Sequence, residues 1–237
     1  MSAAIKALTF DVFGTVVDWR TSIIAEGTAL GERLGVTLDW AEFADAWRGL
    51  YQPSMDQVRN GHRPFAKLDV LHRESLVTLL ERFAITSLSE SEVDALNHAW
   101  HRLRPWPDTV AGLTRLRTRF TLATLSNGNV ALLTNMAKSA GLPWDAVLGA
   151  EVSGHYKPQP EAYLKTADLL GLEPQQCMLV AAHNGDLVAA SKAGFRTAFV
   201  ARPTEYGPNQ TRDSKAEHDF DYVANSMEDL ADQLECG

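Results

Sequence analysis

The chain alternates short apolar segments with helix-forming segments, and this alternation restricts the possible folds more than any other feature. Three of the helical segments end at a glycine, namely Gly141, Gly171 and Gly194. Such alternation is typical of a parallel β-sheet with helices on both faces. Strands are predicted at residues 5–10, 121–126, 147–152, 177–182, 196–201 and 221–224. Helices are predicted at residues 108–116, 130–140, 160–170, 186–193 and 227–235.

One long segment interrupts this alternation. From residue 21 to residue 103 the apolar residues recur at helical spacing, as Phe43 and Trp47 do, and strand signals are few. Residues 104–107 (Arg-Pro-Trp-Pro) then form a rigid break that could act as a hinge. We therefore expect an α/β protein with a Rossmann-like core, residues 1–18 and 105–237, and an inserted all-helical cap domain, residues 19–104.

Charge and cysteine content narrow the class of protein. The net charge is −8, which argues against a nucleic-acid surface, although a local cluster of Lys and Arg could still attract an anionic substrate. With only two cysteines, a disulfide framework is not expected. Cys177 should be a packed thiol, and Cys236, next to the chain end, should be mobile. No segment approaches the roughly 20 apolar residues of a membrane helix, and the first residues do not resemble a signal peptide. The sequence thus predicts a cytoplasmic protein without a nucleic-acid or membrane partner.

Polar residues follow the predicted strands at the positions where parallel sheets bind ligands, beyond the carboxyl ends. They are Asp11, residues 126–128 (Ser-Asn-Gly), Lys157 and residues 183–186 (His-Asn-Gly-Asp). Each has a simpler explanation when taken alone. Asp11 could cap a helix entering at residue 16, residues 126–128 could be only a turn, Lys157 could be a surface lysine, and Asp186 could be an N-cap. Because four chain segments carry such residues in this order, we expect them to share one cleft.

Together these residues resemble a known family. Residues 11–15 (Asp-Val-Phe-Gly-Thr), 125–128 (Leu-Ser-Asn-Gly) and 156–158 (Tyr-Lys-Pro), followed by Asp186, match in order the motifs of the haloacid dehalogenase-like hydrolase superfamily. The resemblance covers nearly the whole chain, including the helical insertion. It implies that Asp11 is a nucleophile that forms a covalent ester with the substrate.

Two departures from the phosphatases of that superfamily point to a different reaction. Those enzymes carry a carboxylate two residues after the nucleophile, which protonates the leaving alkoxide, and another four residues before the last acid, which helps to hold Mg²⁺. Here these positions are Phe13 and Ala182. Mg²⁺ prefers octahedral oxygen ligands, and this site has lost one. We therefore expect no metal and no cofactor. A halide, unlike an alkoxide, can leave carbon without a proton.

The chain accordingly resembles the L-2-haloacid dehalogenases, and the resemblance implies a role for each matching residue. Lys157 would keep Asp11 ionised, and Asp186 would pair with Lys157 and position water. Arg48, in a Trp47–Arg48 pair of the cap, would contact the departing halide. Alternatively, Trp47 only packs within the cap and Arg48 is a solvated helix arginine. Substrate binding is assigned, besides Arg48, to the matching residues Thr15, Ser126, Asn127 and Tyr163.

One segment departs from these dehalogenases. They often have Ser-Ser-Asn-x-x-Asp before the last acid, whereas this chain has Ala-Ala-His-Asn-Gly-Asp at residues 181–186. His183 would either take over the contact of the missing asparagine or act as the base for ester hydrolysis. A turn histidine bonded to backbone is the simpler alternative. Asn184, beside it, is a further candidate catalytic residue.

The sequence therefore predicts an (S)-2-haloacid dehalogenase, a hydrolase that acts on carbon–halide bonds. It would convert short-chain 2-haloalkanoic acids to 2-hydroxy acids through an aspartyl ester, without a metal. The alternatives are a phosphatase of this superfamily that acts on a small phosphate ester, and a binding protein that has kept the fold without catalysis. The resemblance also suggests a homodimer formed through the cap helices.

Overall fold

A five-stranded parallel sheet lies at the centre of residues 4–237, the part of the chain that the computed structural model describes. Residues 1–3 of the predicted core lie outside the described residues. In sheet order, the strands are β4 (Thr121–Thr124), β1 (Ala7–Phe10), β5 (Cys177–Ala181), β6 (Arg196–Val200) and β7 (Tyr222–Ala224). The predicted α/β fold is confirmed, and β1, which leads to Asp11, lies between β4 and β5.

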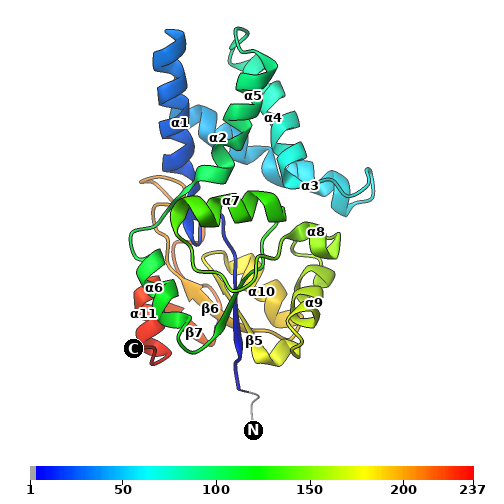
Figure 1. Cartoon of the computed structure of the whole chain (residues 1–237), viewed down its shortest axis with the longest axis vertical. Coiled ribbons are helices and arrows are strands. Elements are labelled where there is room, and N and C mark those ends of the chain that lie inside the picture. Colours follow the sequence, from blue (N-terminus) through cyan, green and yellow to red (C-terminus); the bar gives the residue numbers. More distant parts are fainter. Residues whose placement is uncertain (1–3) are drawn as a thin grey trace.

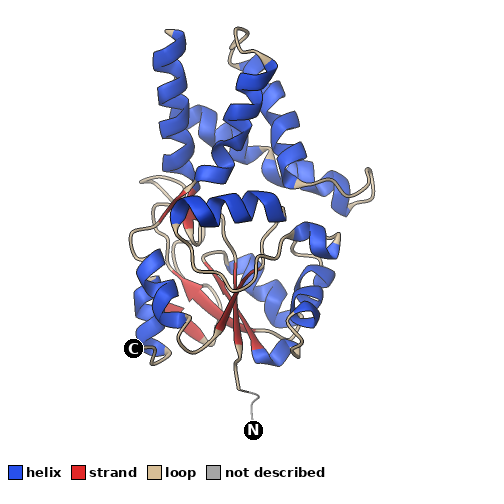
Figure 2. Cartoon of the chain, in the orientation of Figure 1, coloured by secondary structure: helices blue, strands red, loops and turns tan. Residues whose placement is uncertain are grey.

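Helices cover both faces of this sheet, as Figures 1 and 2 show. Alternate residues of β5 belong to two separate apolar clusters, with Met178 and Val180 in one and Leu179 and Ala181 in the other. A strand buried on both sides consists of a continuous run of apolar residues, which is why residues 177–182 predict a strand. The helices are α6 (Thr109–Leu116), α7 (Val130–Ala140), α8 (Ala150–Ser153), α9 (Pro160–Leu169), α10 (Asn184–Lys192) and α11 (Met227–Gln233).

The segment inserted after β1 is helical and stands above the sheet in Figure 1. No described residue between 19 and 103 belongs to a strand. Its elements are α1 (Trp19–Leu34), α2 (Trp40–Gly49), α3 (Tyr51–Arg59), α4 (Leu68–Arg82), α5 (Glu90–Asn97) and the 3-10 helix η1 (His98–Arg102). Within residues 4–237, none of the helices combines the length and apolar character that crossing a membrane requires.

The two connections between this helical segment and the sheet run side by side. β2 (Val17–Asp18) pairs antiparallel with β3 (Arg104–Pro105), so part of the predicted hinge is a short strand. Asp18 also caps α1, because its side chain accepts a hydrogen bond from the backbone of Thr21. The helix therefore begins at Trp19 under Asp18, and not at residue 16 under Asp11.

The predicted strand at residues 147–152 is wrong. Within it only Gly149 forms an isolated bridge, to Ser126, and residues 150–153 are the short helix α8. Gly149 lies so close to the backbone of Gly128 that a Cβ atom would be 2.1 Å from its carbonyl oxygen. Glu151, one residue into α8, accepts a hydrogen bond from the backbone of Val130 at the start of α7. The segment thus accepts a hydrogen bond from the N-terminus of α7 and does not extend the sheet.

Cys236 is the second correction, because it is only 2% exposed and not a mobile end. Helix α11 packs against α6, and Arg115 of α6 donates two hydrogen bonds to the carbonyl oxygen of Cys236. This contact depends on two helices far apart in the sequence, which local patterns do not reveal. Cys177 is buried in β5, as predicted.

Candidate active site

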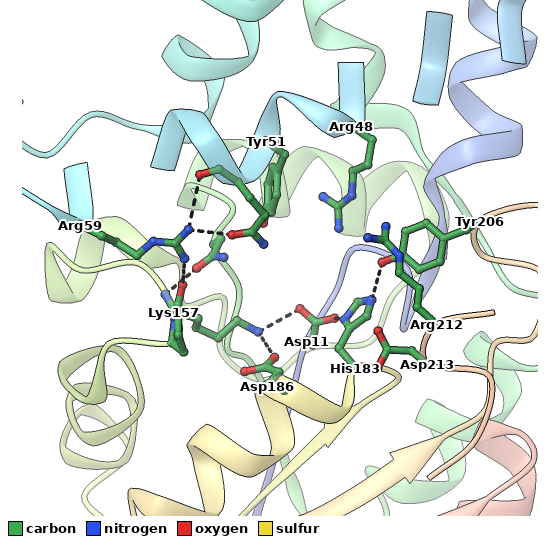
Figure 3. Close-up of a pocket in the computed structure, with 14 residues that line it drawn as sticks. Asp11, Arg48, Tyr51, Arg59, Lys157, His183, Asp186, Tyr206, Arg212 and Asp213 are labelled. Atoms are coloured by element: carbon green, nitrogen blue, oxygen red, sulfur yellow. Dashed lines mark hydrogen bonds and ion pairs between the residues drawn. The ribbon is translucent and has the colours of Figure 1, made fainter. Parts of the chain in front are cut away.

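A cavity of about 390 Å³ lies between the carboxyl end of the sheet and the inserted helices. Figure 3 shows the side chains that point toward it from both parts of the chain. The helical segment contributes Arg48 from α2 and Tyr51, Gln52 and Arg59 from α3. The sheet side contributes Asp11, Asn127, Lys157, Pro158, His183, Gly185, Asp186, Tyr206, Arg212 and Asp213.

Asp11 lies at the centre of this site, directly after β1, and is 7% exposed. One carboxylate oxygen accepts a hydrogen bond from Nζ of Lys157 at 2.9 Å. The other accepts one from Oγ1 of Thr15 at 2.8 Å and lies 3.1 Å from Nδ1 of His183. Burial alone would raise the pKa of Asp11, but the charges of Lys157 and His183 and their hydrogen bonds hold it well below its usual range. Asp11 is therefore an anion at neutral pH.

Lys157 joins two carboxylates. Its Nζ contacts Asp186 as well as Asp11, and its backbone N–H donates to the side chain of Asn127. Burial would lower the pKa of Lys157, but the two carboxylates raise it above its ordinary value. Arg59 of α3 donates to the backbone carbonyl of Lys157, which connects the helical side of the cavity to this lysine.

His183 lies between two carboxylates. Its Nδ1 faces Asp11, and its Nε2 is 2.9 Å from one oxygen of Glu205 and 3.1 Å from the other. Glu205 is fully buried, and Trp19 donates to it at 3.0 Å. Burial would lower the pKa of His183, but Glu205 and Asp11 raise it well above its ordinary value. Burial would raise the pKa of Glu205, yet His183 keeps it low. His183 is not the turn histidine of the simpler alternative.

The structure explains why residue 14, in the first motif, is a glycine. Gly14 has a φ angle of 88°, a conformation that favours glycine. A Cβ atom there would lie 2.1 Å from Oε1 of Glu205. The close approach of this turn to Glu205 thus favours a residue 14 without a side chain, and it brings Glu205 near the turn that follows Asp11.

The two cap residues predicted as a pair have different roles. Trp47 is fully buried and donates to the backbone of His72, so the packing interpretation holds for it. Arg48 lines the cavity, with its guanidinium carbon 4.1 Å from the ring centre of Tyr51 and 5.4 Å from that of Trp19. Its Nη1 is buried without a hydrogen-bond partner among the described residues. Arg48 is therefore not a solvated helix arginine.

Three other predicted residues support the site from outside the cavity lining. Thr15 is fully buried behind Asp11, where its hydroxyl donates to Asp11 and accepts from the backbone of Ala182, so it orients Asp11 and does not face the cavity. Tyr163, also fully buried, donates to Asp186 at 2.6 Å and does not reach the cavity either. The hydroxyl oxygen of Ser126 accepts a hydrogen bond from the backbone of Gly128.

Asn184, predicted as catalytic, points away from Asp11. Its amide donates to Asp213 and to the carbonyl of Lys215, and its oxygen accepts from the backbone of Glu217. It thus fixes the segment that follows β6. This irregular segment, residues 201–221, supplies functional residues that the sequence reasoning missed: Glu205, Tyr206, Arg212 and Asp213. Its unusual length without helical or strand periodicity was the available signal.

The residues around Asp11 do not fit a magnesium ion. Both oxygens of Asp11 and both oxygens of Asp186 already accept hydrogen bonds from cationic or hydroxyl donors. Phe13 packs against the rings of Tyr51 and Trp100, and Ala182 is a buried methyl group. The octahedral oxygen shell that Mg²⁺ requires is therefore not provided. In the described part of the chain, no group of three or more His, Cys, Asp or Glu residues is arranged to hold a metal.

Comparisons with known proteins agree with this geometry. The model of the haloacid dehalogenase-like hydrolase family matches residues 5–194. The structure is similar to that of the L-2-haloacid dehalogenase PA0810, with 51% identity, a TM-score of 0.95, and 99% of this chain and 100% of that chain covered. It is also similar to the defluorinating L-2-haloacid dehalogenase Rha0230, with 48% identity, a TM-score of 0.96, and 98% and 95% of the two chains covered. A third similar structure, of the L-2-haloacid dehalogenase from Xanthobacter autotrophicus with chloropropionic acid covalently bound, has 25% identity, a TM-score of 0.80 and 98% of each chain covered.

Proposed function

We propose that this chain, which belongs to the haloacid dehalogenase-like hydrolase family, hydrolyses the carbon–halogen bond of (S)-2-haloalkanoic acids and forms 2-hydroxy acids. One observation carries the proposal. An ionised, buried Asp11 shares its cavity with Arg48, whose guanidinium has no hydrogen-bond partner among the described residues. The pair offers a nucleophile for carbon and a cation for the halide that leaves it. The 51% and 48% identical L-2-haloacid dehalogenases support the same chemistry.

In the first step, Asp11 attacks C2 of the substrate from the side opposite the halogen. The carbon–halogen bond breaks with its electron pair, which gives an ester on Asp11 and a halide anion beside Arg48. Lys157 and Thr15 hold the carboxylate of Asp11 in place for this attack. No proton is needed, in agreement with Phe13 at the position where phosphatases of this family have an acid. Arg48 lowers the barrier because the charge that it stabilises develops only as the bond breaks.

In the second step, water attacks the carbonyl carbon of the Asp11 ester, and we assign the base to His183. Formation of the ester removes the negative charge of Asp11, so the pKa of His183 falls and the histidine can release its proton to solvent. Neutral His183 then accepts a proton from the attacking water and returns it to the leaving 2-alkoxide. The second proton of the water passes from the re-formed Asp11 carboxyl to His183, which restores the Asp11 carboxylate and the protonated histidine. Glu205 keeps the imidazole oriented and stabilises the imidazolium that forms.

The remaining roles follow from position. We assign residues 19–104 to a cap domain and residues 1–18 and 105–237 to the core, because the cavity lies between them. Asn127, which lines the cavity shortly after β4, is assigned to the substrate carboxylate, and the neighbouring Ser126, outside the lining, is assigned to holding the turn that presents Asn127. Asp186 is assigned to fixing Lys157 and positioning the water, with Tyr163 holding Asp186. The proposal includes a cytoplasmic, homodimeric protein, to be tested by fractionation and by analytical ultracentrifugation.

The deciding experiment measures halide release from (S)-2-chloropropionate in the presence of EDTA. The dehalogenase releases chloride under these conditions. A phosphatase would be silent here and would hydrolyse small phosphate esters when Mg²⁺ is supplied, and a binding protein would do neither. Turnover that EDTA abolishes and Mg²⁺ restores would contradict the proposal, because residues 13 and 182 offer no ligand oxygen.

A further inference from the structure

A second cavity, of about 440 Å³, shares a wall with the catalytic cavity. Arg48, Tyr51, Gln52, Tyr206 and Arg212 line both. We call this second cavity the outer cavity. Its remaining lining residues are Trp19, Asp45 and Gly49. Arg48 and Arg212 thus face both the space beside Asp11 and the space beyond it, and Figure 3 shows the two guanidinium groups on the same side of the site.

The lining of the outer cavity carries more positive than negative charge. Arg212 lies flat on the ring of Tyr206, with its guanidinium carbon 3.5 Å from the ring centre. Among the residues that the structure describes, neither Arg212 nor Arg48 forms an ion pair with a carboxylate. Asp45, the carboxylate of the lining, accepts two hydrogen bonds from Arg20, at 2.7 and 2.8 Å. A cavity with two guanidinium groups and a carboxylate that is already paired favours an anion.

We propose that the outer cavity is a halide site, through which the halide formed beside Arg48 leaves by way of Arg212. This inference rests on the proposed function. Moving a bare halide through a partly buried space without a partner would be costly, and a second guanidinium next to the first avoids that cost. Guanidinium groups are weakly hydrated, and aromatic rings line the route, which suits a large, weakly hydrated anion. The transfer also removes a negative charge from the surroundings of the Asp11 ester before water attacks it.

A binding experiment tests the site without turnover. Bromide is titrated into the protein at constant ionic strength, and quenching of tryptophan fluorescence is followed, since Trp19 lines the outer cavity. We expect saturable quenching in the wild type and in the inactive Asp11→Asn variant. Arg212→Gln should weaken it about tenfold or more, whereas Arg212→Lys should keep most of the affinity because it keeps the charge. Arg33→Gln, an exposed site on α1 that lines neither cavity, controls for the change in net charge.

A kinetic experiment separates the outer site from the halide position inside the catalytic cavity. Bromide in the outer cavity can bind together with the substrate, so in the wild type it should lower kcat as well as raise KM. In Arg212→Gln only competition at the inner position should remain, seen in KM alone. Purely competitive inhibition of the wild type, or quenching that Arg212→Gln leaves unchanged, would overturn the proposal. If the protein bound bromide as expected but released no halide from 2-haloacids, the anion site would stand and the proposed function would fall.

Discussion

Replacing Glu205 by glutamine tests the assignment of the second half-reaction most directly. The glutamine oxygen can still accept hydrogen bonds from Trp19 and His183, so the shape of the site is kept while the charge is lost. Both Glu205 oxygens lie 2.9–3.1 Å from Nε2 of His183. Losing a buried charge at this distance should lower the pKa of His183 by about 1–3 units, which is about 1.4–4 kcal/mol.

This loss of free energy should raise the barrier to ester hydrolysis and leave the barrier to halide release unchanged. The imidazolium forms in the second step, so Glu205→Gln should slow hydrolysis by about 10- to 1000-fold. Rapid-quench measurements should show a burst of about one halide per site, and intact-mass spectrometry should show the ester accumulating on Asp11. Glu217→Gln, at an exposed site on the same irregular segment, should behave as the wild type. A Glu205→Gln enzyme with normal turnover and no ester would refute the role of this pair.

The loss of stability in the Glu205→Gln variant should depend on pH. The folded-state pKa of His183 lies above its ordinary value of 6.5, so its contribution is complete below that value and is lost as the pH rises through the folded-state pKa. The pKa of Glu205 is lowered from 4.5, so its contribution is present above 4.5 and is lost as the pH falls through the folded-state pKa. Because His183 keeps Asp11 as a partner, the lost pairing should cost the same about 1.4–4 kcal/mol of unfolding free energy. In urea unfolding, this loss should be largest between pH 4.5 and 6.5 and should shrink at higher pH.

Three further variants test other parts of the site. Asp11→Asn should lose kcat and kcat/KM together, and a single wild-type turnover in H₂¹⁸O should give product whose new oxygen is unlabelled; labelled product would mean direct attack by water. Arg59→Met removes a charged donor from the carbonyl of Lys157 and should lower kcat/KM by about 10- to 100-fold, while the matched variant Arg63→Met, at a half-buried side chain that lines neither cavity, should not; equal values for the two would exclude a positioning role. Gly14→Ala should place a methyl group against Glu205 and lower both the melting temperature and the rate of ester hydrolysis; a wild-type hydrolysis rate would show that Glu205 can move without consequence.

Local rules explain why much of the fold could be read from the sequence. Helix α7 runs from Val130 to Ala140 and ends at Gly141, as predicted, because a glycine at φ 68° terminates a helix through contacts within a few residues. Strand β5 was recognisable because burial on both faces selects an apolar run. The segment at residues 147–152 was misread because its conformation follows from a close approach to Gly128 and from capping of α7, and both partners lie outside the segment.

In the candidate site, too, some features follow from local sequence and others depend on the packing of the whole chain. Asp11, Lys157, His183 and Asp186 were predicted to converge, and they line one cavity. The reason holds for Asp11, His183 and Asp186, which follow β1 and β5 at the carboxyl end of the sheet, whereas Lys157 follows the helix α8 and not the strand predicted before it. The orientations of the Thr15, Tyr163 and Asn184 side chains could not be predicted. Each side chain forms hydrogen bonds with groups that the packing of the whole chain brings near it.

The sequence by itself determined the alternation of strands and helices, the place of the helical insertion, and the residues that follow each strand, because periodicity and turn chemistry act over a few residues. Tertiary structure alone decided that Glu205, 22 residues beyond His183, lies within hydrogen-bond distance of it, and that Arg48 and Arg212 line the same two cavities. Such contacts join separate elements whose relative positions depend on how the whole core packs. A buried charge takes its pKa and its chemistry from those neighbours, so the reactivity of this site is a property of the folded chain.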